Sequence, residues 1–192
     1  MFWKSAIAAA CLVLSAATVA AQGPIPVPDV PANLNVPEGF TPFLLGHAEG
    51  TQNYICLPAE KGFAWTLFGP QATLFDGNGA QLTTHFLSPN PVEDGVLRAT
   101  WQDSRDTSRV WAMAVASSTD PAYVAGGSVA WLLLRVVGAE LGPNAGAALF
   151  DAKYVHRVNT AGGTAPAAGC DHKKDLGKRQ FVTYTTDYIF YR

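Results

Sequence analysis

Three histidines could take part in acid–base or metal chemistry, because histidine alone titrates near neutral pH without a perturbed environment. His85 lies near the end of an expected strand, beside the loop 87–91 with its two prolines. A histidine there can reach the mouth of a cleft, so His85 is the candidate general base if the protein is an enzyme. His156, inside another expected strand, and His172, in a polar loop, could join His85 around a metal ion. No H-x-H or H-E-x-x-H spacing supports this, so we expect no metal or other cofactor and favour structural histidines.

Three other residues could contact a ligand. Trp101 belongs to a set of aromatic residues that could stack on sugars, although packing between strands is the more common role of such rings. Arg157 and Asn159 open the run Arg157-Val158-Asn159-Thr160-Ala161-Gly162-Gly163, which is expected to end a strand and turn sharply on its glycines. Arg157 is either exposed or paired with a buried carboxylate such as Asp187, and we favour that pair over a ligand-binding role.

The N-terminus indicates export from the cytoplasm. One lysine precedes an apolar, uncharged stretch at 5–20 that ends in Val19-Ala20-Ala21-Gln22. This pattern predicts a signal peptide at 1–21 rather than a retained anchor, because the run is short for a membrane span. We therefore expect a secreted or periplasmic protein with no membrane span after cleavage.

Two cysteines, Cys56 and Cys170, remain after the expected cleavage. In an oxidising compartment an even number of cysteines most simply forms a disulfide. A reactive thiolate and a metal ligand remain the alternatives for both residues.

Composition excludes several classes of protein. The chain has 192 residues, of which 48% are hydrophobic, and a formal net charge of −2. Such a composition is typical of a packed domain rather than a disordered chain. Nucleic acid is not an expected partner, because the chain lacks the basic surplus that neutralises phosphates.

The remaining pattern predicts a proline-rich arm at 22–42, acting as a linker or strap outside the core, and one β domain at 43–192. Short runs of β-branched and aromatic residues alternate with turn residues. The fold class is therefore all-β, first as an antiparallel β-sandwich or jelly-roll-like domain and alternatively as a closed β-barrel. The apolar run 129–134 has no polar alternation, which indicates a strand covered on both faces. About nine strands are expected, at 53–57, 63–68, 72–76, 80–86, 96–102, 109–116, 129–137, 154–160 and 180–190.

A set of short motifs resembles a known family. The motifs include Tyr54-x-Cys56, Trp65-x-Leu67-x-Gly69-Pro70, the run 157–163 described above, and Gly169-Cys170. Together they resemble the secreted proteins grouped as domain of unknown function 3455, over roughly residues 40–192. The resemblance implies one extracytoplasmic domain with Cys56 and Cys170 paired, and it supplies no catalytic residues.

These observations favour a non-catalytic module that binds a small molecule, a glycan or a cell-surface component. The rival is a small secreted hydrolase or metal-dependent enzyme centred on His85. A third possibility is an envelope protein without a ligand. The sequence does not contain a nucleophile motif that would decide for the enzyme.

Overall fold

The computed structural model describes residues 23–170 and 173–192, which form eight β-strands, four short 3-10 helices and no α-helix. This confirms the all-β prediction. The 3-10 helices are η1 (Ala32–Leu34), η2 (Pro91–Glu93), η3 (Pro143–Ala145) and η4 (Lys173–Asp175). The strands are β1 (Pro42–Pro58), β2 (Phe63–Phe75), β3 (Gln81–Asn90), β4 (Val96–Asp103), β5 (Arg109–Ser118), β6 (Trp131–Glu140), β7 (Tyr154–Gly162) and β8 (Arg179–Tyr191).

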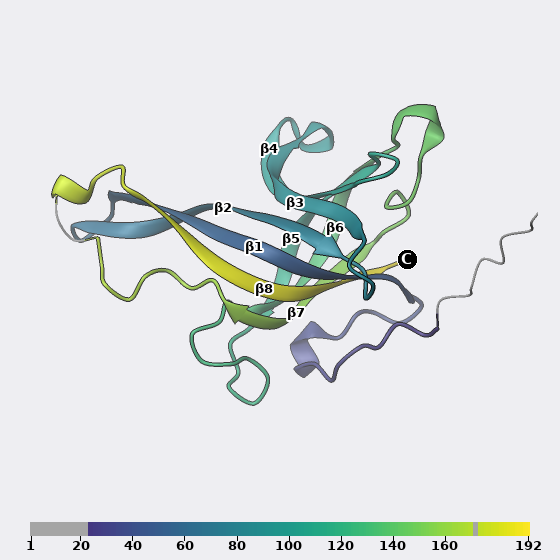
Figure 1. The fold of residues 1–192 in the computed structure, drawn as a ribbon, viewed down its shortest axis with the longest axis horizontal. Helices are drawn as coiled ribbons and strands as arrows, with labels where there is room; N and C mark the ends of the chain where they lie inside the picture. Colours follow the sequence, from purple (N-terminus) through teal and green to yellow (C-terminus); the bar gives the residue numbers. More distant parts are fainter. Residues whose placement is uncertain (1–22, 171–172) are drawn as a thin grey trace, which may run out of the picture.

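The strands close into a barrel in sequence order (Figure 1). Each strand pairs antiparallel with the next, and β8 returns to pair with β1. Closure removes the unpaired edges that an open sheet exposes. Of the two arrangements that the sequence left open, the closed barrel is therefore the one that forms.

One expected pair of strands is a single strand. The ranges 63–68 and 72–76 both belong to β2, which bends between them at a register shift opposite Asn53 and Tyr54. Gly69 lies at this bend with a φ of 145°. A β-bulge of this kind bends a strand without ending it, so eight strands form instead of about nine.

The ends of β1, β2 and β8 extend beyond the rest of the barrel as a projecting ribbon (Figure 1). Cys56 in β1 forms a disulfide with Cys170, in the segment that leads from β7 to η4. The two Cα atoms are 5.8 Å apart. The predicted disulfide is thus confirmed, and it holds the connection between β7 and β8 against the projecting ribbon.

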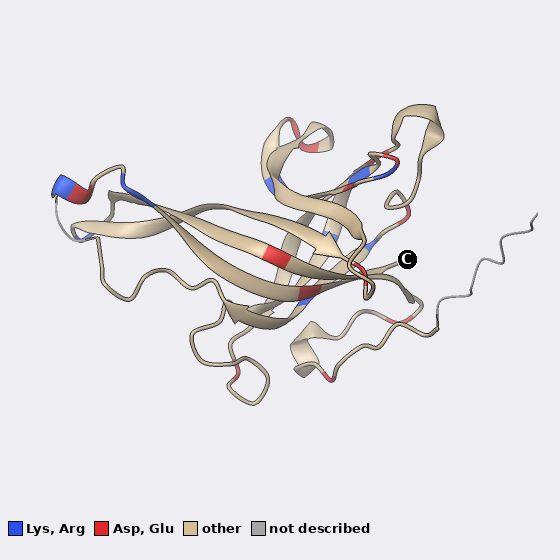
Figure 2. Cartoon of the chain, viewed as in Figure 1, with Lys and Arg blue, Asp and Glu red and all other residues tan. Residues whose placement is uncertain are grey.

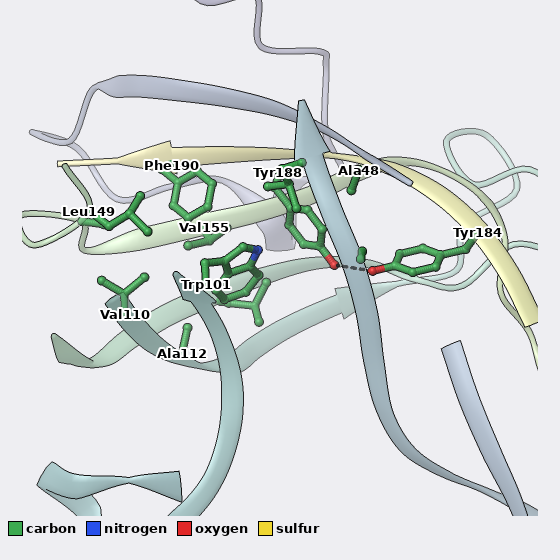
Figure 3. Close-up of a cluster of buried hydrophobic side chains, with 13 residues drawn as sticks. Ala48, Trp101, Val110, Ala112, Leu149, Val155, Tyr184, Tyr188 and Phe190 are labelled. Carbon is green, nitrogen blue, oxygen red and sulfur yellow. Dashed lines mark hydrogen bonds between the residues drawn. The ribbon is translucent and has the colours of Figure 1, made fainter. Parts of the chain in front are cut away.

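The barrel interior holds the main hydrophobic core. Val110, Leu149 and Phe190 gather on one side of Trp101, and Tyr188 lies on its other side (Figure 3). The Trp101 ring packs edge to face with Phe190 at a centroid distance of 5.7 Å and with Tyr188 at 5.2 Å. Such edge-to-face packing adds stabilisation beyond the burial of apolar area.

The proline-rich arm packs against the outside of the barrel. Leu34 is fully buried there, in a second cluster with Trp131 and Leu133 of β6 and with Ile189 of β8. The sequence pattern predicts an arm outside the core, whereas Leu34 is buried because it packs against Trp131 and Leu133. The arm also explains the apolar run 129–134, since Leu134 faces the interior core while Trp131 and Leu133 face the arm.

A buried histidine ties the arm to the barrel. His156 Nε2 lies 2.7 Å from the Leu34 carbonyl oxygen, and His156 Nδ1 lies 2.9 Å from the Tyr191 hydroxyl. A carbonyl only accepts, so Nε2 donates to Leu34 and Nδ1 accepts from Tyr191. Burial lowers the pKa of His156, and its hydrogen bond to the Leu34 carbonyl partly opposes this shift.

Within the described residues, no helix has the length and apolar character that crossing a membrane requires. The expected signal peptide at 1–21 lies outside the described residues.

Removal of the disulfide should destabilise the protein substantially. The bridge joins residues 114 positions apart, and closing a loop of this size stabilises a folded chain by about 5 kcal/mol in the chain-entropy account. We expect the double variant Cys56→Ala/Cys170→Ala to unfold at a clearly lower urea concentration than the wild type. Dithiothreitol should lower the midpoint of the wild type and leave that of the variant unchanged. Equal midpoints for the oxidised wild type and the variant would contradict the prediction.

His156 should make stability depend on pH. The unfolded histidine has a pKa of about 6.5, and the folded pKa is lower, so the fold favours the neutral form. The resulting stabilisation is complete above pH 6.5 and declines as the pH falls below it, by at most about 1.4 kcal/mol per pH unit. Thermal unfolding between pH 7.5 and 5 should show a steeper fall in Tm for the wild type than for His156→Gln. Parallel curves would show that His156 does not carry this dependence.

Candidate functional site

A cavity of about 340 Å³ opens into the barrel. Every strand contributes at least one residue to its wall. Eight strands enclose a space that side chains can fill or that can hold one small ligand. In this barrel, side chains fill one part of the interior and the cavity occupies another.

His85 and Trp101 form one wall of the cavity. They are direct partners across β3 and β4, and their rings stack 4.2 Å apart at an interplanar angle of 10°. His85 Nδ1 donates to the Thr100 carbonyl at 2.9 Å, which leaves the lone pair on Nε2. Burial lowers the pKa of His85 to about 3, the hydrogen bond to Thr100 opposes this shift, and the nearby charge of Arg157 adds to it. His85 is therefore neutral at ordinary pH.

Arg157 lies at the cavity without the predicted carboxylate partner. Its Nε and Nη2 atoms both donate to the Ala130 carbonyl, at 3.1 and 2.8 Å. Asp187 instead bonds to His47 and Asn159. The expectation of an Arg157–Asp187 pair is thus wrong.

The register of β7 and β8 explains this difference. Arg157 stands opposite Tyr188, whereas Val158 stands opposite Asp187. Adjacent residues of a strand point to opposite faces of the sheet. Arg157 and Tyr188 therefore line the interior, and Asp187 faces outward.

Two tyrosines and a glutamine complete the polar part of the barrel interior. The hydroxyls of Tyr184 and Tyr188 lie 3.4 Å apart (Figure 3). Burial raises the pKa of Tyr188, and the Arg157 guanidinium beside it partly opposes this shift. Gln52 lines the cavity, and its buried Nε2 has no hydrogen-bond partner in the described chain. The sequence analysis missed Gln52, because the neighbouring Thr51 and Asn53 are polar as well.

The glycines that end the expected turn at 157–163 lie against two polar side chains of the barrel interior. Gly162 and Gly163 both have positive φ, as the sequence indicated. A Cβ atom on Gly163 would lie 2.8 Å from the Tyr184 side chain and 3.0 Å from Gln52. The glycine therefore leaves the space that these two polar side chains occupy.

Leucines form much of the rest of the cavity wall, and Leu132 pairs directly with Arg157 across β6 and β7. Leu67 and Leu97 line it while remaining 50% and 61% exposed, so they stand at its opening, and Leu87 and Leu132 lie with them in the wall. Arg98 is also at the wall, but Glu93 accepts two hydrogen bonds from it, each at 2.8 Å. These bonds, with one from Asn90, lower the pKa of Glu93 to about 2. The charge of Arg98 is thus already balanced.

Charged residues are sparse on the strands and gather in turns and at the end of the projecting ribbon (Figure 2). Of the residues that line the cavity, only Arg98 and Arg157 carry a charge. Because Glu93 neutralises Arg98, Arg157 dominates the electrostatic potential inside.

The other predicted site residues lie elsewhere. Asn159 has a φ of 54° at an irregularity in β7 and donates to Asp187 on the outer face. His156 lies beneath the arm, on the opposite side of the sheet from His85, and His172 lies outside the described residues. In the part of the chain that the structure describes, no three His, Cys, Asp or Glu side chains are placed to hold a metal ion.

Comparison with curated proteins and with solved structures gives no match. The sequence profile of one family, described as "protein of unknown function (DUF3455)", matches residues 37–192. This span contains the whole barrel, both disulfide cysteines and every residue of the cavity wall. The chain therefore belongs to the DUF3455 family of proteins of unknown function.

Proposed function

We propose that this protein is a non-catalytic binding module that holds one small molecule inside its barrel. The observation that carries the proposal is the cavity itself, which combines a wall rich in leucine with a few polar groups. Pockets for small molecules have this composition, and a volume of about 340 Å³ lies within their usual range.

The state of His85 favours binding over catalysis. An efficient general base has a pKa near the operating pH, whereas burial lowers the pKa of His85 to about 3. Its Nδ1 bonds to a backbone carbonyl rather than to a carboxylate that could stabilise an imidazolium. A buried neutral imidazole beside Trp101 is well suited to contact a ligand and poorly suited to move a proton.

The burial of the tryptophans favours a small molecule over a glycan laid on the surface. Trp101, Trp111 and Trp131 are each at most 5% exposed. Trp65 is half-buried, and its Nε1 donates to the Ala168 carbonyl. Surface stacking on sugars needs exposed rings, and these four serve packing or the cavity wall instead.

The disulfide fits a protein that works outside the cytoplasm, since such bonds persist in oxidising compartments. Together with the expected signal peptide, it supports secretion or a periplasmic location for the binding module.

Blocking the cavity opening should abolish binding. We expect 1-octanol to bind with one-to-one stoichiometry and a Kd of about 1 mM or tighter, as judged from the usual affinity per non-hydrogen atom. Ala114 lines the cavity and is exposed, so Ala114→Trp should cover the opening without disturbing the core. Isothermal titration calorimetry should show affinity at least tenfold weaker for this variant.

Val115→Trp is the matched control, because Val115 is exposed and does not line the cavity. It should bind 1-octanol as the wild type does. Equal affinities of the two variants would place the ligand outside the barrel. Circular dichroism and Tm measurements on both would verify that each remains folded.

A further inference from the structure

The polar side of the cavity presents hydrogen-bond donors that lack acceptors. Gln52 and Trp101 are 2% and 0% exposed, and both line the cavity. Within residues 23–170 and 173–192, neither Gln52 Nε2 nor Trp101 Nε1 makes a hydrogen bond of good geometry, although Gln52 lies near enough to the Tyr184 hydroxyl to oppose the rise in the pKa of that tyrosine. A buried donor without an acceptor destabilises a fold. Both donors would be satisfied by an acceptor group that enters the cavity.

Arg157 adds a positive charge to these donors. Among the described residues no carboxylate pairs with it, and its Nε and Nη2 share a single carbonyl oxygen, that of Ala130. A guanidinium has five N–H groups, so donors remain for a ligand. The guanidinium lies near enough to Tyr188 and His85 to influence the pKa of each. Its charge therefore acts at the same side of the cavity as the unpartnered donors.

This set of groups selects an anion of one charge. Arg157 is the one cation at the cavity that lacks a carboxylate in the described chain, which matches a carboxylate better than a phosphate of nearly two charges. Guanidinium groups bind carboxylates with favourable planar geometry. A sugar fits less well, because its many hydroxyls need acceptors as well as donors, and leucines form much of the remaining wall.

The volume limits the size of the ligand. At about 30 Å³ for each non-hydrogen atom, the share of a water molecule in the liquid, the cavity of about 340 Å³ holds about eleven such atoms. The leucines at the opening provide for an apolar chain or ring that extends outward from the acid group.

We propose that the barrel binds a small amphipathic monocarboxylate, with its carboxylate at Arg157, Gln52 and Trp101 and its apolar part against Leu67, Leu87, Leu97 and Leu132. This inference rests on the proposed function and names the ligand class for the same cavity. Arg157 is the charged anchor, and Gln52 supplies a second hydrogen bond from the neighbouring part of the wall.

Comparison of octanoate with 1-octanol tests the ligand class. The two probes share an eight-carbon chain and differ in the acid group. At pH 7.5, calorimetry should give an affinity at least tenfold higher for octanoate. In ¹H–¹⁵N spectra, the indole resonance of Trp101 and the side-chain amide of Gln52 should shift more with octanoate. If both probes bind equally, the binding function holds and the carboxylate assignment is wrong. If neither binds up to millimolar concentration, the proposed function itself is contradicted.

Substitution of Arg157 tests whether its positive charge contributes to octanoate binding. Arg157→Gln should weaken octanoate binding at least tenfold and change 1-octanol binding less than threefold, because only the acid group requires the guanidinium. Arg135→Gln is the control, since it removes the same charge from an exposed position on β6. It should leave octanoate binding within threefold of the wild type. Equal losses of octanoate affinity in the two variants would show that only the net charge of the protein matters. That result would overturn the assignment of Arg157 as the anchor of the carboxylate.

Gln52→Leu separates a binding role from a structural one. The substitution removes a buried donor that has no partner in the described chain, so the ligand-free variant should be at least as stable as the wild type. Octanoate affinity should nevertheless fall at least fivefold. A variant that loses stability in urea unfolding but keeps its affinity would assign Gln52 to the fold rather than to the ligand.

Discussion

The antiparallel pairing of β1 with β8 is the constraint on which the rest of the structure depends. It joins the first and last strands over a register that runs from Pro42 and Tyr191 to Ile55 and Arg179. Such a distant pairing costs chain entropy before it yields contacts, and it converts one face of a curved sheet into an interior. Within this ladder, Gly46 stands opposite Tyr188, and Gly50 stands opposite Tyr184. A Cβ atom on Gly46 would lie 2.8 Å from the Leu74 side chain, and one on Gly50 would collide with the backbone of Gln71, so the two glycines allow β1 to approach β2 closely.

Closure also gives each strand an inside and an outside, and β7 and β8 use both. Adjacent residues of β7 have different roles, because Arg157 meets the cavity while His156 bonds to Leu34 of the arm. On β8, Tyr188 packs inside and Ile189 packs under the arm. A parallel separation appears among the charged groups, since Asp187 serves the outer surface with His47. The absence of Asp187 from the interior is what leaves the positive charge of Arg157 available there.

Much of this fold follows from local sequence pattern. The turn residues Asp76-Gly77-Asn78-Gly79 form a hairpin, with the Asp76 carboxylate accepting from the backbone of Asn78 and Ala80. The disulfide and the doubly covered β6 were also predictable, from compartment and composition. A sandwich and a barrel, in contrast, require the same alternation along each strand, so pattern alone could not choose between them. The bend at Gly69 merges two expected strands, and the neighbour of Arg157 depends on a register that only the complete ladder sets. Gln52 carries no local signal, because its burial results from closure.

The barrel interior has a packed part, which contributes to stability, and an open part, which is available to bind a ligand. Around Trp101, the side chains of Val110, Leu149 and Phe190 fill space and contribute to the hydrophobic core. On the other side, Gln52 and Arg157 face a volume that no side chain occupies. Eight-stranded barrels can be filled entirely by side chains, and a leucine in place of Gln52 would avoid an unpartnered buried amide. The polar groups at the cavity are therefore not needed for the stability of the ligand-free fold. A ligand that accepts their hydrogen bonds accounts for their presence. Such a ligand would also stabilise the folded protein by the same contacts through which it is recognised.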